Sequence, residues 1–524
     1  MKRTLQLLCV FLFCFTVTAS INAQDELYFD EVFENVTVTD GVEYGVNLEV
    51  ITGAPLAKSL LMDIYEPTGD TSTERPLVLM VHTGTFLPPV VNGGVTGTTK
   101  DSSIVEISRR LAKRGFLVAA IDYRQGWNPL ALTKDDRVNG LINAAYRGVQ
   151  DFRTAVRFFR KNSAEYGVDT DKIAGFGMGT GAYIVHGAAT LFDEAQLNIP
   201  KFLILDPVTG DLVPMVLPPV SGDINGLGFP TETDTNVLNY PNHAGFSSDI
   251  NFAFTAGGAT ADLSWITENS VPLAGVQVAT DPNAPFLCDI LLAPPDNEEI
   301  VEVCGLGEAI PVYNNLGVNN VLNEIVYDDV YTQAAENSIA ELVANGTAFE
   351  PAAEYDQLAG QNHVFPMLRP YPHSAPWEWW DSDFWSQVPC PPNAPEGCPN
   401  MDFLAKLSHP DMSEELASAY IDTIMGFFLP RANYALSSIV GLEELSTINA
   451  SISPNPSASN FNINVPEEII QSIRVYDMTG SLVKEINGIN ANQYVLKGEE
   501  FNSGIYILNI NTKDNSVGQK IVVE

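Results

Sequence analysis

Short, almost entirely apolar segments alternate with longer amphipathic ones between residues 76 and 177. PLVLMVH at 76–82, FLVAAIDY at 116–123 and KIAGFG at 172–177 have the composition of strands that are buried on both faces of a parallel sheet. Longer segments separate them, and at 140–166 apolar side chains recur at helical spacing. Strands and helices in this order predict right-handed crossovers and an α/β, doubly wound sheet.

Further strands are predicted on both sides of this region. Alternating apolar positions at 28–65 indicate antiparallel edge strands, while NFAFTAGGA at 251–259 and PLAGVQVATD at 272–281 indicate two more core strands. An amphipathic helix at 414–428 is expected to close this domain before Pro430.

The composition of the chain changes several times and predicts its division into domains. The α/β domain is expected at 25–435, with irregular cap insertions at about 192–250 and 283–360. A connector at 436–449 leads to 450–524, where short alternating strands separated by turn residues predict a small all-β sandwich.

The first residues indicate export. Lys2 and Arg3 precede an apolar run at 5–17, and Ala23 offers a small residue for cleavage, so 1–23 is predicted to be a secretory signal peptide. The run is too short to span a bilayer, and no later segment is apolar enough to do so.

The charge of the chain excludes one class of partner. A formal net charge of −38 leaves no Lys/Arg cluster that could neutralise a phosphate backbone, so nucleic acid is not expected as a ligand. An acidic surface that keeps an exported protein in solution is the simpler interpretation.

Four cysteines remain after the predicted signal peptide, in two pairs that are close in sequence. In an exported chain an even number favours disulfides, and local pairing is the favoured one of the three connectivities, Cys288 with Cys304 and Cys390 with Cys398. A metal site is the rival interpretation, but neither pair has CxxC spacing and histidines are few. No metal and no cofactor is predicted.

Several segments, taken in order, resemble the esterase and lipase side of the α/β-hydrolase superfamily. They are LLMDIYEP, RPLVLMVHTGTF, GFLVAAIDYR and the run AYRGVQDFRTAVRFFRKNSAEYGVDTDKIAGFG. Within them, residues 82–86 stand where the family has its oxyanion loop HGGxF. The resemblance implies an α/β-hydrolase fold and, for an active member, hydrolysis of carboxylic esters.

The nucleophile of that family is missing. Its elbow motif G-x-S-x-G corresponds to residues 177–181, and Gly179 occupies the serine position. Thr180 is one residue away, and its side chain is expected to point away from the nucleophile position. Ordinary acyl-enzyme catalysis is therefore not expected.

The family's residue order, nucleophile then acid then histidine, implies the other site residues. Asp281 is the favoured acid, and an Asx-type turn before a proline is the structural alternative. His373 is the first candidate for the histidine and His363 the second; a merely structural histidine is the alternative. The backbone amides at Gly84 and Thr180 are the candidate oxyanion hole. The residues predicted to line a ligand pocket are Thr85, Phe86, Met178 and Trp377.

Three functions remain open at this point. The chain is a degenerate hydrolase that binds a small ester or glycan-derived ligand, an atypical ester hydrolase in which Asp281 and His373 activate water, or a structural cell-surface protein. A pocket with a separated acid and histidine favours the first, a paired acid and histidine beside Gly179 the second, and the lack of a pocket the third.

The last part of the chain resembles the type A C-terminal sorting domain of the type IX secretion system. The motifs that carry the resemblance are SPNP at 453–456, VYDMTG at 475–480, GIYIL at 504–508 and KIVVE at 520–524. The resemblance implies that the secretion machinery is a partner, and that the protein is secreted or held at the cell surface.

Overall fold

The computed structural model describes residues 27–206, 208–227, 238–293, 298–392, 394–437, 450–457, 459–466, 468–477, 482–513 and 516–523. Its contacts divide the chain between Ser437 and Ser438 into two compact units. The predicted signal peptide at 1–23, connector residues 438–449 and the turn at 478–480 lie outside the described residues. Among the described residues no helix combines the length and apolar character needed to cross a bilayer.

An eight-stranded sheet forms the centre of the first unit. Its strands, in spatial order, are β1 (Val36–Glu49), β2 (Leu56–Pro67), β4 (Leu117–Ile121), β3 (Arg75–Val81), β5 (Val168–Met178), β8 (Phe252–Ala256), β9 (Leu273–Val278) and β12 (Val364–Met367). The pairs β1–β2 and β2–β4 are antiparallel, and every pair from β4 onward is parallel. The α/β fold and the antiparallel edge are therefore confirmed.

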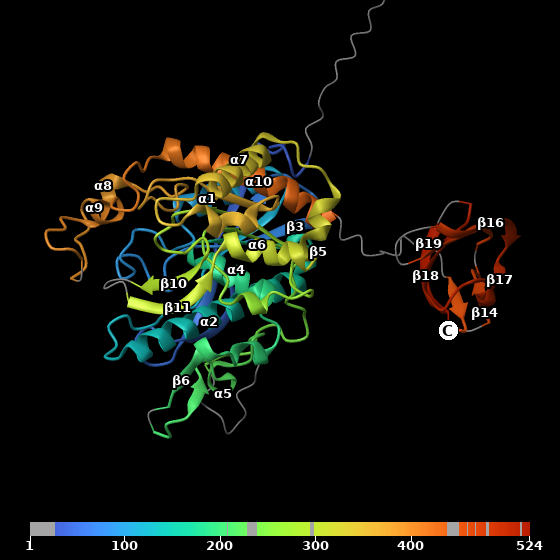
Figure 1. Cartoon of the computed structure of the whole chain (residues 1–524), viewed down its shortest axis with the longest axis horizontal. Coiled ribbons are helices and arrows are strands. Elements are labelled where there is room, and N and C mark those ends of the chain that lie inside the picture. Colours follow the sequence, from blue (N-terminus) through green and yellow to red (C-terminus); the bar gives the residue numbers. More distant parts are fainter. Residues whose placement is uncertain are drawn as a thin grey trace, which may run out of the picture. The chain divides into compact units, whose positions relative to one another are not determined.

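Helices cover both faces of this sheet (Figure 1). The longer ones are α1 (Ser102–Lys113), α2 (Lys134–Lys161), α4 (Thr180–Thr190), α6 (Leu306–Asn315), α7 (Val330–Asn345) and α10 (Glu414–Ser437). Strand β3 shows how the layers form, since Leu77 and Leu79 pack into the core that contains α2 and α4. Val78 and Met80, which point the other way, pack into the core that contains α1 and α10.

The two predicted insertions differ in character. The first holds two 3-10 turns (Glu194–Leu197 and Pro200–Phe202), a hairpin of β6 (Leu203–Leu205) and β7 (Leu212–Pro214), and the short helix α5 (Pro218–Ser221). The second is not irregular as predicted, because it contains a hairpin of β10 (Cys288–Ala293) and β11 (Glu298–Cys304) followed by α6 and α7. Pro311 inside α6 obscured that helix in the sequence, although Leu306, Ile310 and Tyr313 are fully buried.

The helix expected to end before Pro430 continues to Ser437, which corrects the predicted boundary. A proline inside a helix removes one N–H donor and crowds the carbonyl four residues earlier. Here that residue is Gly426, and the nearby carbonyl of Phe427 accepts a hydrogen bond of 2.9 Å from the Arg431 guanidinium. Three further short helices complete the unit, α3 (Ser163–Tyr166), α8 (Ser382–Trp385) and α9 (Met401–Ala405).

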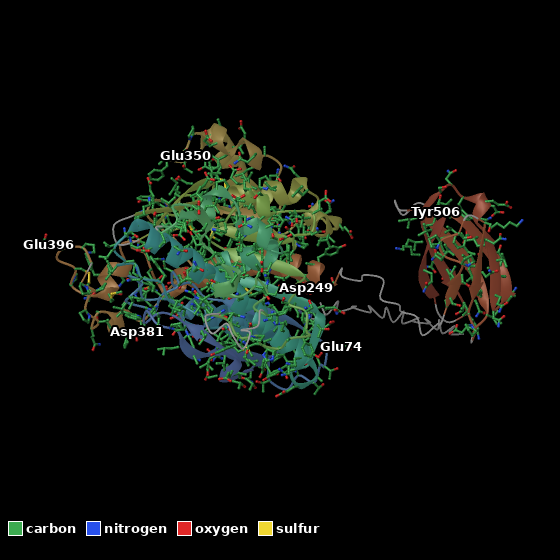
Figure 2. All side chains as sticks on the ribbon, turned by 90° about the horizontal axis from the view of Figure 1, so that it is seen from below. Glu74, Asp249, Glu350, Asp381, Glu396 and Tyr506 are labelled. Carbon is green, nitrogen blue, oxygen red and sulfur yellow. A yellow bond between two sulfur atoms is a disulfide. The ribbon has the colours of Figure 1, made fainter. Side chains whose placement is uncertain are left out.

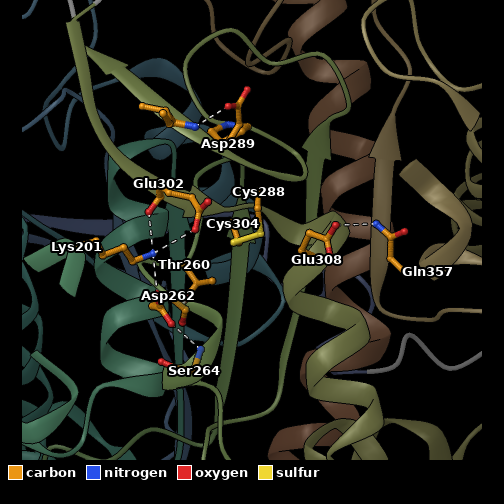
Figure 3. Close-up of a disulfide and its surroundings, with 12 residues drawn as sticks. Lys201, Thr260, Asp262, Ser264, Cys288, Asp289, Glu302, Cys304, Glu308 and Gln357 are labelled. Carbon is orange, nitrogen blue, oxygen red and sulfur yellow. Dashed lines mark hydrogen bonds and ion pairs between the residues drawn. A yellow bond between two sulfur atoms is a disulfide. The ribbon is translucent and has the colours of Figure 1, made fainter. Parts of the chain in front are cut away.

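Both predicted disulfides are present, Cys288–Cys304 and Cys390–Cys398. The first joins β10 to β11 at directly paired positions, and Thr260 exchanges two backbone hydrogen bonds with Cys304 (Figure 3). Lys201 of the first insertion adds an ion pair with Asp262 at 2.8 Å and donates to the carbonyl of Glu302 in β11. The base of the hairpin is therefore fixed to the end of β8 and to the first insertion.

We expect the paired change Cys288→Ser/Cys304→Ser to lower the free energy of unfolding by about 3 kcal/mol, the chain-entropy value for a loop of this length. The measurement is denaturant unfolding of the variant and the unmodified protein, with the m-values of the two compared. The matched control is Cys390→Ser/Cys398→Ser, which opens a loop with a sequence separation of 8 rather than 16. An unchanged unfolding midpoint in the first variant would contradict the prediction.

The second unit consists of two small antiparallel sheets. Strands β13 (Ser451–Ser453), β14 (Asn460–Asn464) and β17 (Gln493–Lys497) form one; β16 (Leu482–Ala491), β15 (Ile470–Asp477), β18 (Gly504–Asn511) and β19 (Ser516–Val523) form the other. Their inward side chains share one core, which includes Phe461, Leu508 and the ring of Tyr506 (Figure 2). The prediction of a small all-β unit is confirmed.

Candidate functional site

The turn between β5 and α4 has the shape of a nucleophile elbow without a nucleophile. Gly179 adopts φ 52° and ψ −114°, a conformation that side-chain-bearing residues rarely adopt. Its N–H donates to the carbonyl of Ala256 at 2.9 Å, and its own carbonyl accepts from Ala182 at 3.0 Å. These bonds hold the turn tightly between β8 and the first turn of α4.

The side chain of Thr83 fills the space in which a serine side chain would lie. A Cβ at position 179 would stand 2.3 Å from Thr83 Oγ1 and 2.9 Å from Thr83 Cβ, closer than real Cβ contacts. The Thr83 hydroxyl also accepts a 3.4 Å hydrogen bond from the backbone N–H of Thr180, one of the predicted oxyanion donors. Thr83 was not predicted to take part in the site, because only the fold brings it against the elbow.

The side chain of Thr180 makes a second hydrogen bond between the elbow and residues 82–86. The Thr180 hydroxyl accepts a 2.7 Å hydrogen bond from the backbone N–H of Thr85 in the oxyanion loop. Two backbone amides of the family's oxyanion region therefore bond to threonine hydroxyls of this chain. Such amides would otherwise be free to stabilise a developing negative charge.

Residues 82–86, the predicted oxyanion loop, are closely packed and hydrogen-bonded. Gly84 has φ 126°, and a Cβ there would lie 2.8 Å from the Cα of Gly97. The indole N–H of Trp127 donates to the carbonyl of Thr85 at 2.8 Å. His82 is buried, stacks on Tyr123 at 4.6 Å and approaches the Asp122 carboxylate at 3.5 Å, so its place is structural.

A cavity of about 440 Å³ opens beside the elbow. Polar residues line it from the loops that follow β3, β9 and β12, from the first turn of α4 and from the loop before α10, among them Thr83, Thr180, Tyr183, Asp281, Glu378 and His409. Apolar side chains reach it from α2, the first insertion and the β10–β11 hairpin, among them Leu141, Ile142, Val149, Phe202, Ile300 and Val301. The volume lies in the range of small-molecule sites, and the lining is amphipathic.

Most predicted pocket residues line this cavity: Gly84, Thr85, Phe86, Gly179, Thr180, Asp281 and Trp377. Met178 does not, because as the last residue of β5 it points to the opposite face, into the core shared with α10. His363 and His373 do not line it either. The structure therefore brings the predicted acid to the elbow, but not either predicted histidine.

Asp281 follows β9 and forms the local turn that was the alternative explanation for it. Its Oδ1 accepts a 2.8 Å hydrogen bond from the backbone N–H of Asn283, as expected of an Asx turn. Burial raises the pKa of Asp281 to about 6, with the backbone bonds from Asn283 and Ala284 opposing the rise.

The two predicted histidines are engaged elsewhere. The Arg369 guanidinium donates to His373 Nδ1 at 2.9 Å, and the Asp411 carboxylate lies 3.5 Å from the same nitrogen. His363 lies 2.9 Å from Asn323 Oδ1 through Nε2, and burial lowers the pKa of its imidazole to about 3. Neither ring is bonded to Asp281.

Two groups that sequence reasoning did not select do line the cavity. His409 lies 3.0 Å from the Ser408 hydroxyl through Nδ1, while its Nε2 is buried without a hydrogen-bond partner. Glu378 is 5% exposed and its Oε2 has no partner; burial and the nearby Asp101 carboxylate raise its pKa to about 8. Its position within the aromatic run at 377–380 was the only signal for it in the sequence.

Comparison with known proteins finds a family model that matches part of each unit. Residues 62–204 match the family model described as BD-FAE, and residues 451–524 match the one described as a secretion system C-terminal sorting domain. Endo-1,4-beta-xylanase B of Butyrivibrio fibrisolvens is 28% identical over 88 residues, which are 17% of this chain and 14% of that protein. The chain therefore spans only a small part of that curated relative.

Solved structures of esterases are also similar to this chain. Esterase 2 of Thermogutta terrifontis, phosphonylated by cyclosarin, is 17% identical, with 48% of this chain and 75% of that chain covered and a TM-score of 0.26. The monoclinic form of a Pyrobaculum calidifontis esterase is 22% identical, with 30% and 39% covered and a TM-score of 0.19. The protein therefore carries a secretion-system C-terminal sorting domain, which marks it as secreted or located at the cell surface, and residues 62–204 of its α/β domain match the BD-FAE family.

Proposed function

We propose that this protein binds a ligand in the cavity beside the elbow without hydrolysing it. The observation that carries the proposal is the Thr83 side chain, which occupies the space of the missing nucleophile next to Gly179. Loss of the nucleophile from a serine hydrolase lowers turnover on the order of a million-fold. The chain has lost not only the serine but also the room for it.

The cavity supports ligand binding over a purely structural role. A structural cell-surface protein needs no hollow at the former active site, whereas this one retains a cavity of about 440 Å³ with polar and apolar walls. An empty hollow also weakens a core by forgoing packing contacts. Its retention is best explained by an occupant.

The arrangement of the histidines argues against the water-activating alternative. That mechanism requires His373 to be oriented by Asp281 and to face a water molecule at the elbow. His373 instead bonds to Arg369 and approaches Asp411, and it does not line the cavity. Activation of water by this pair is therefore not the function that we propose.

We expect the purified protein to bind octyl 4-nitrophenyl ether, a non-hydrolysable aryl probe, and to leave 4-nitrophenyl esters from acetate to octanoate intact. Calorimetry measures the first result, and release of nitrophenolate the second. In Ala145→Trp the indole would fill part of the cavity, so affinity for the ether should fall about tenfold or more as apolar contacts are lost.

The matched control is Asp135→Trp, which places the same side chain on an exposed position of α2 and should leave binding unchanged. No binding of any octyl probe would overturn the proposal. Ester turnover that disappears in His373→Ala would overturn it in favour of the water-activating hydrolase.

A further inference from the structure

We propose that the ligand is an organic cation: a protonated or quaternary amine attached to an apolar body. This inference rests on the proposed function and specifies its ligand. Five features carry it: the charges of the cavity wall, the groups around one point near the elbow, a buried carboxyl oxygen without a hydrogen-bond partner, the apolar walls, and the charge of the whole chain.

The cavity wall contains acids but no cationic side chain. The described residues that line the cavity include two acids, Asp281 and Glu378, but neither a lysine nor an arginine. The remaining titratable groups are His409, whose pKa is lowered by burial, and tyrosines. An anionic ligand head would meet carboxyl groups with no counter-charge, and a cation would supply the charge that the wall lacks.

One point near the elbow is surrounded by the groups that bind ammonium ions. A Cβ built on Gly257 would stand 3.9 Å from Asp281 Oδ2 and 3.8 Å from Cζ2 of Trp377. The third neighbour of that position is the Gly179 nitrogen at 3.9 Å, whose N–H already donates to the carbonyl of Ala256. Gly257, Asp281 and Trp377 all line the cavity, so a ligand in it can contact the carboxylate and the ring together. A carboxylate together with an aromatic ring is the combination that stabilises ammonium groups by charge and by the ring quadrupole.

Glu378 supplies an unused polar atom at the same cavity. Its side chain is buried and Oε2 has no hydrogen-bond partner, which is costly for a buried polar atom. Glu378 lies near Asp101, whose carboxylate already accepts hydrogen bonds from the backbone of Gly97 and Thr98. A primary ammonium group can donate up to three hydrogen bonds and would satisfy Glu378, whereas a quaternary ammonium group would supply only the opposite charge.

The apolar walls suit the rest of such a ligand. Leu141 and Val149 of α2 and Ile300 and Val301 of β11 all line the cavity, and the disulfide fixes the base of that hairpin (Figure 3). Apolar surface buried there would contribute roughly in proportion to its area. A polyol would gain less from these walls than a ligand with an alkyl or aryl body.

The net charge of the whole chain also favours a cationic ligand over an anionic one. The formal net charge is −38, and exposed acids such as Glu74, Asp249, Glu350 and Asp381 are spread over the first unit (Figure 2). A field of this sign raises the local concentration of cations and lowers that of anions.

Binding of a cation should be linked to proton release. Burial raises the pKa of both Asp281 and Glu378, and a cation favours their ionised forms. The groups that face them are Tyr183 beside Asp281 and Asp101 beside Glu378, with His82 beyond Asp101. Affinity for a cation should therefore rise as pH increases from about 5 to about 9, the range over which these carboxyls ionise.

The test compares octyltrimethylammonium, octylamine, octanol and octanoate on the intact protein by calorimetry in two buffers of different ionisation enthalpy. We expect both cations to bind about tenfold or more tightly than octanol, octanoate to bind most weakly, and protons to be released with the cations only. Asp281→Asn and Glu378→Gln should each reduce this preference, whereas the control Glu350→Gln on the exposed surface should not.

The outcomes separate this inference from the proposed function. If octanol binds as tightly as the cations and no protons are released, the inference of a cationic ligand is wrong. The proposal that the cavity binds a ligand would then still stand, for a neutral ligand. Binding of none of the four, nor of the aryl ether, would overturn both. If a variant does not fold, the pH dependence of cation binding and the proton release measured on the unmodified protein still test the inference.

Discussion

Replacing Gly179 by serine is expected to destabilise the first unit by about 2–5 kcal/mol and to leave it without esterase activity. Two effects add. The new side chain requires a φ of +52°, and its Cβ would overlap Thr83 Oγ1 at 2.3 Å. Activity stays absent because no histidine bonded to Asp281 stands ready to accept the serine proton.

Thermal and denaturant unfolding of the variant measure the loss, and two control variants separate its causes. Gly53 has φ +81° and nothing within 4 Å of a built Cβ, so Gly53→Ala reports the cost of a positive φ without a clash. The double change Thr83→Gly/Gly179→Ser removes the clash while keeping the strain. We expect it to recover part of the stability lost in Gly179→Ser, with the coupling energy that contacting residues show.

Two results would contradict this account. If Gly179→Ser unfolds no more easily than Gly53→Ala, Thr83 does not fill the serine position. If Gly179→Ser hydrolyses aryl esters, a general base acts at the elbow. The protein then lacks only the nucleophile of a hydrolase site and not the other catalytic groups.

The architecture was predictable because its signal is local and repeated. Strand β3 at Arg75–Val81 and strand β4 at Leu117–Ile121 are buried along their whole length, and apart from Arg75 at the start of β3 each appears in the sequence as an apolar run. The disulfides followed from the number and spacing of cysteines. The α6 helix was missed because Pro311 breaks the local pattern, while burial of Ile310 and Tyr313 supplies the stabilisation.

The site was predictable only as far as residue order determines it. Asp281 follows β9, and the residue order of the family that the chain resembles placed it near the elbow. The contact between Thr83 and Gly179 joins residues that are far apart in sequence and depends on a side-chain rotamer, which no motif records. His409 was not among the predicted histidines, because the motifs do not point to it; the loop between α9 and α10 carries it to the cavity wall.

A second large effect is expected at a fully buried ion pair in the first unit. Arg124 follows β4 and Asp151 lies on α2; both side chains are 0% exposed. The Arg124 Nε donates to both carboxylate oxygens at 2.9 Å, and its backbone N–H donates to Oδ2 at 2.7 Å. The guanidinium also donates to the carbonyl of Leu238 and to Gln150 Oε1.

We expect Asp151→Ala to lower the free energy of unfolding by about 3–5 kcal/mol, because it leaves a buried guanidinium without its counter-charge. Denaturant unfolding followed by circular dichroism is the measurement. The control is Glu299→Ala, which removes the exposed partner of Lys134 at 3.7 Å and should cost less than about 1 kcal/mol.

The double change Arg124→Met/Asp151→Leu shows whether the stranded charge causes the loss. If the unpaired guanidinium dominates, replacing both partners with apolar side chains should cost less than Asp151→Ala alone, although the carbonyl of Leu238 and Gln150 Oε1 each lose a donor. If the double variant is the less stable one, the bonds from Arg124 to these two acceptors outweigh the ion pair. The contribution of this buried network would then come from joining β4, α2 and the first insertion rather than from charge neutralisation.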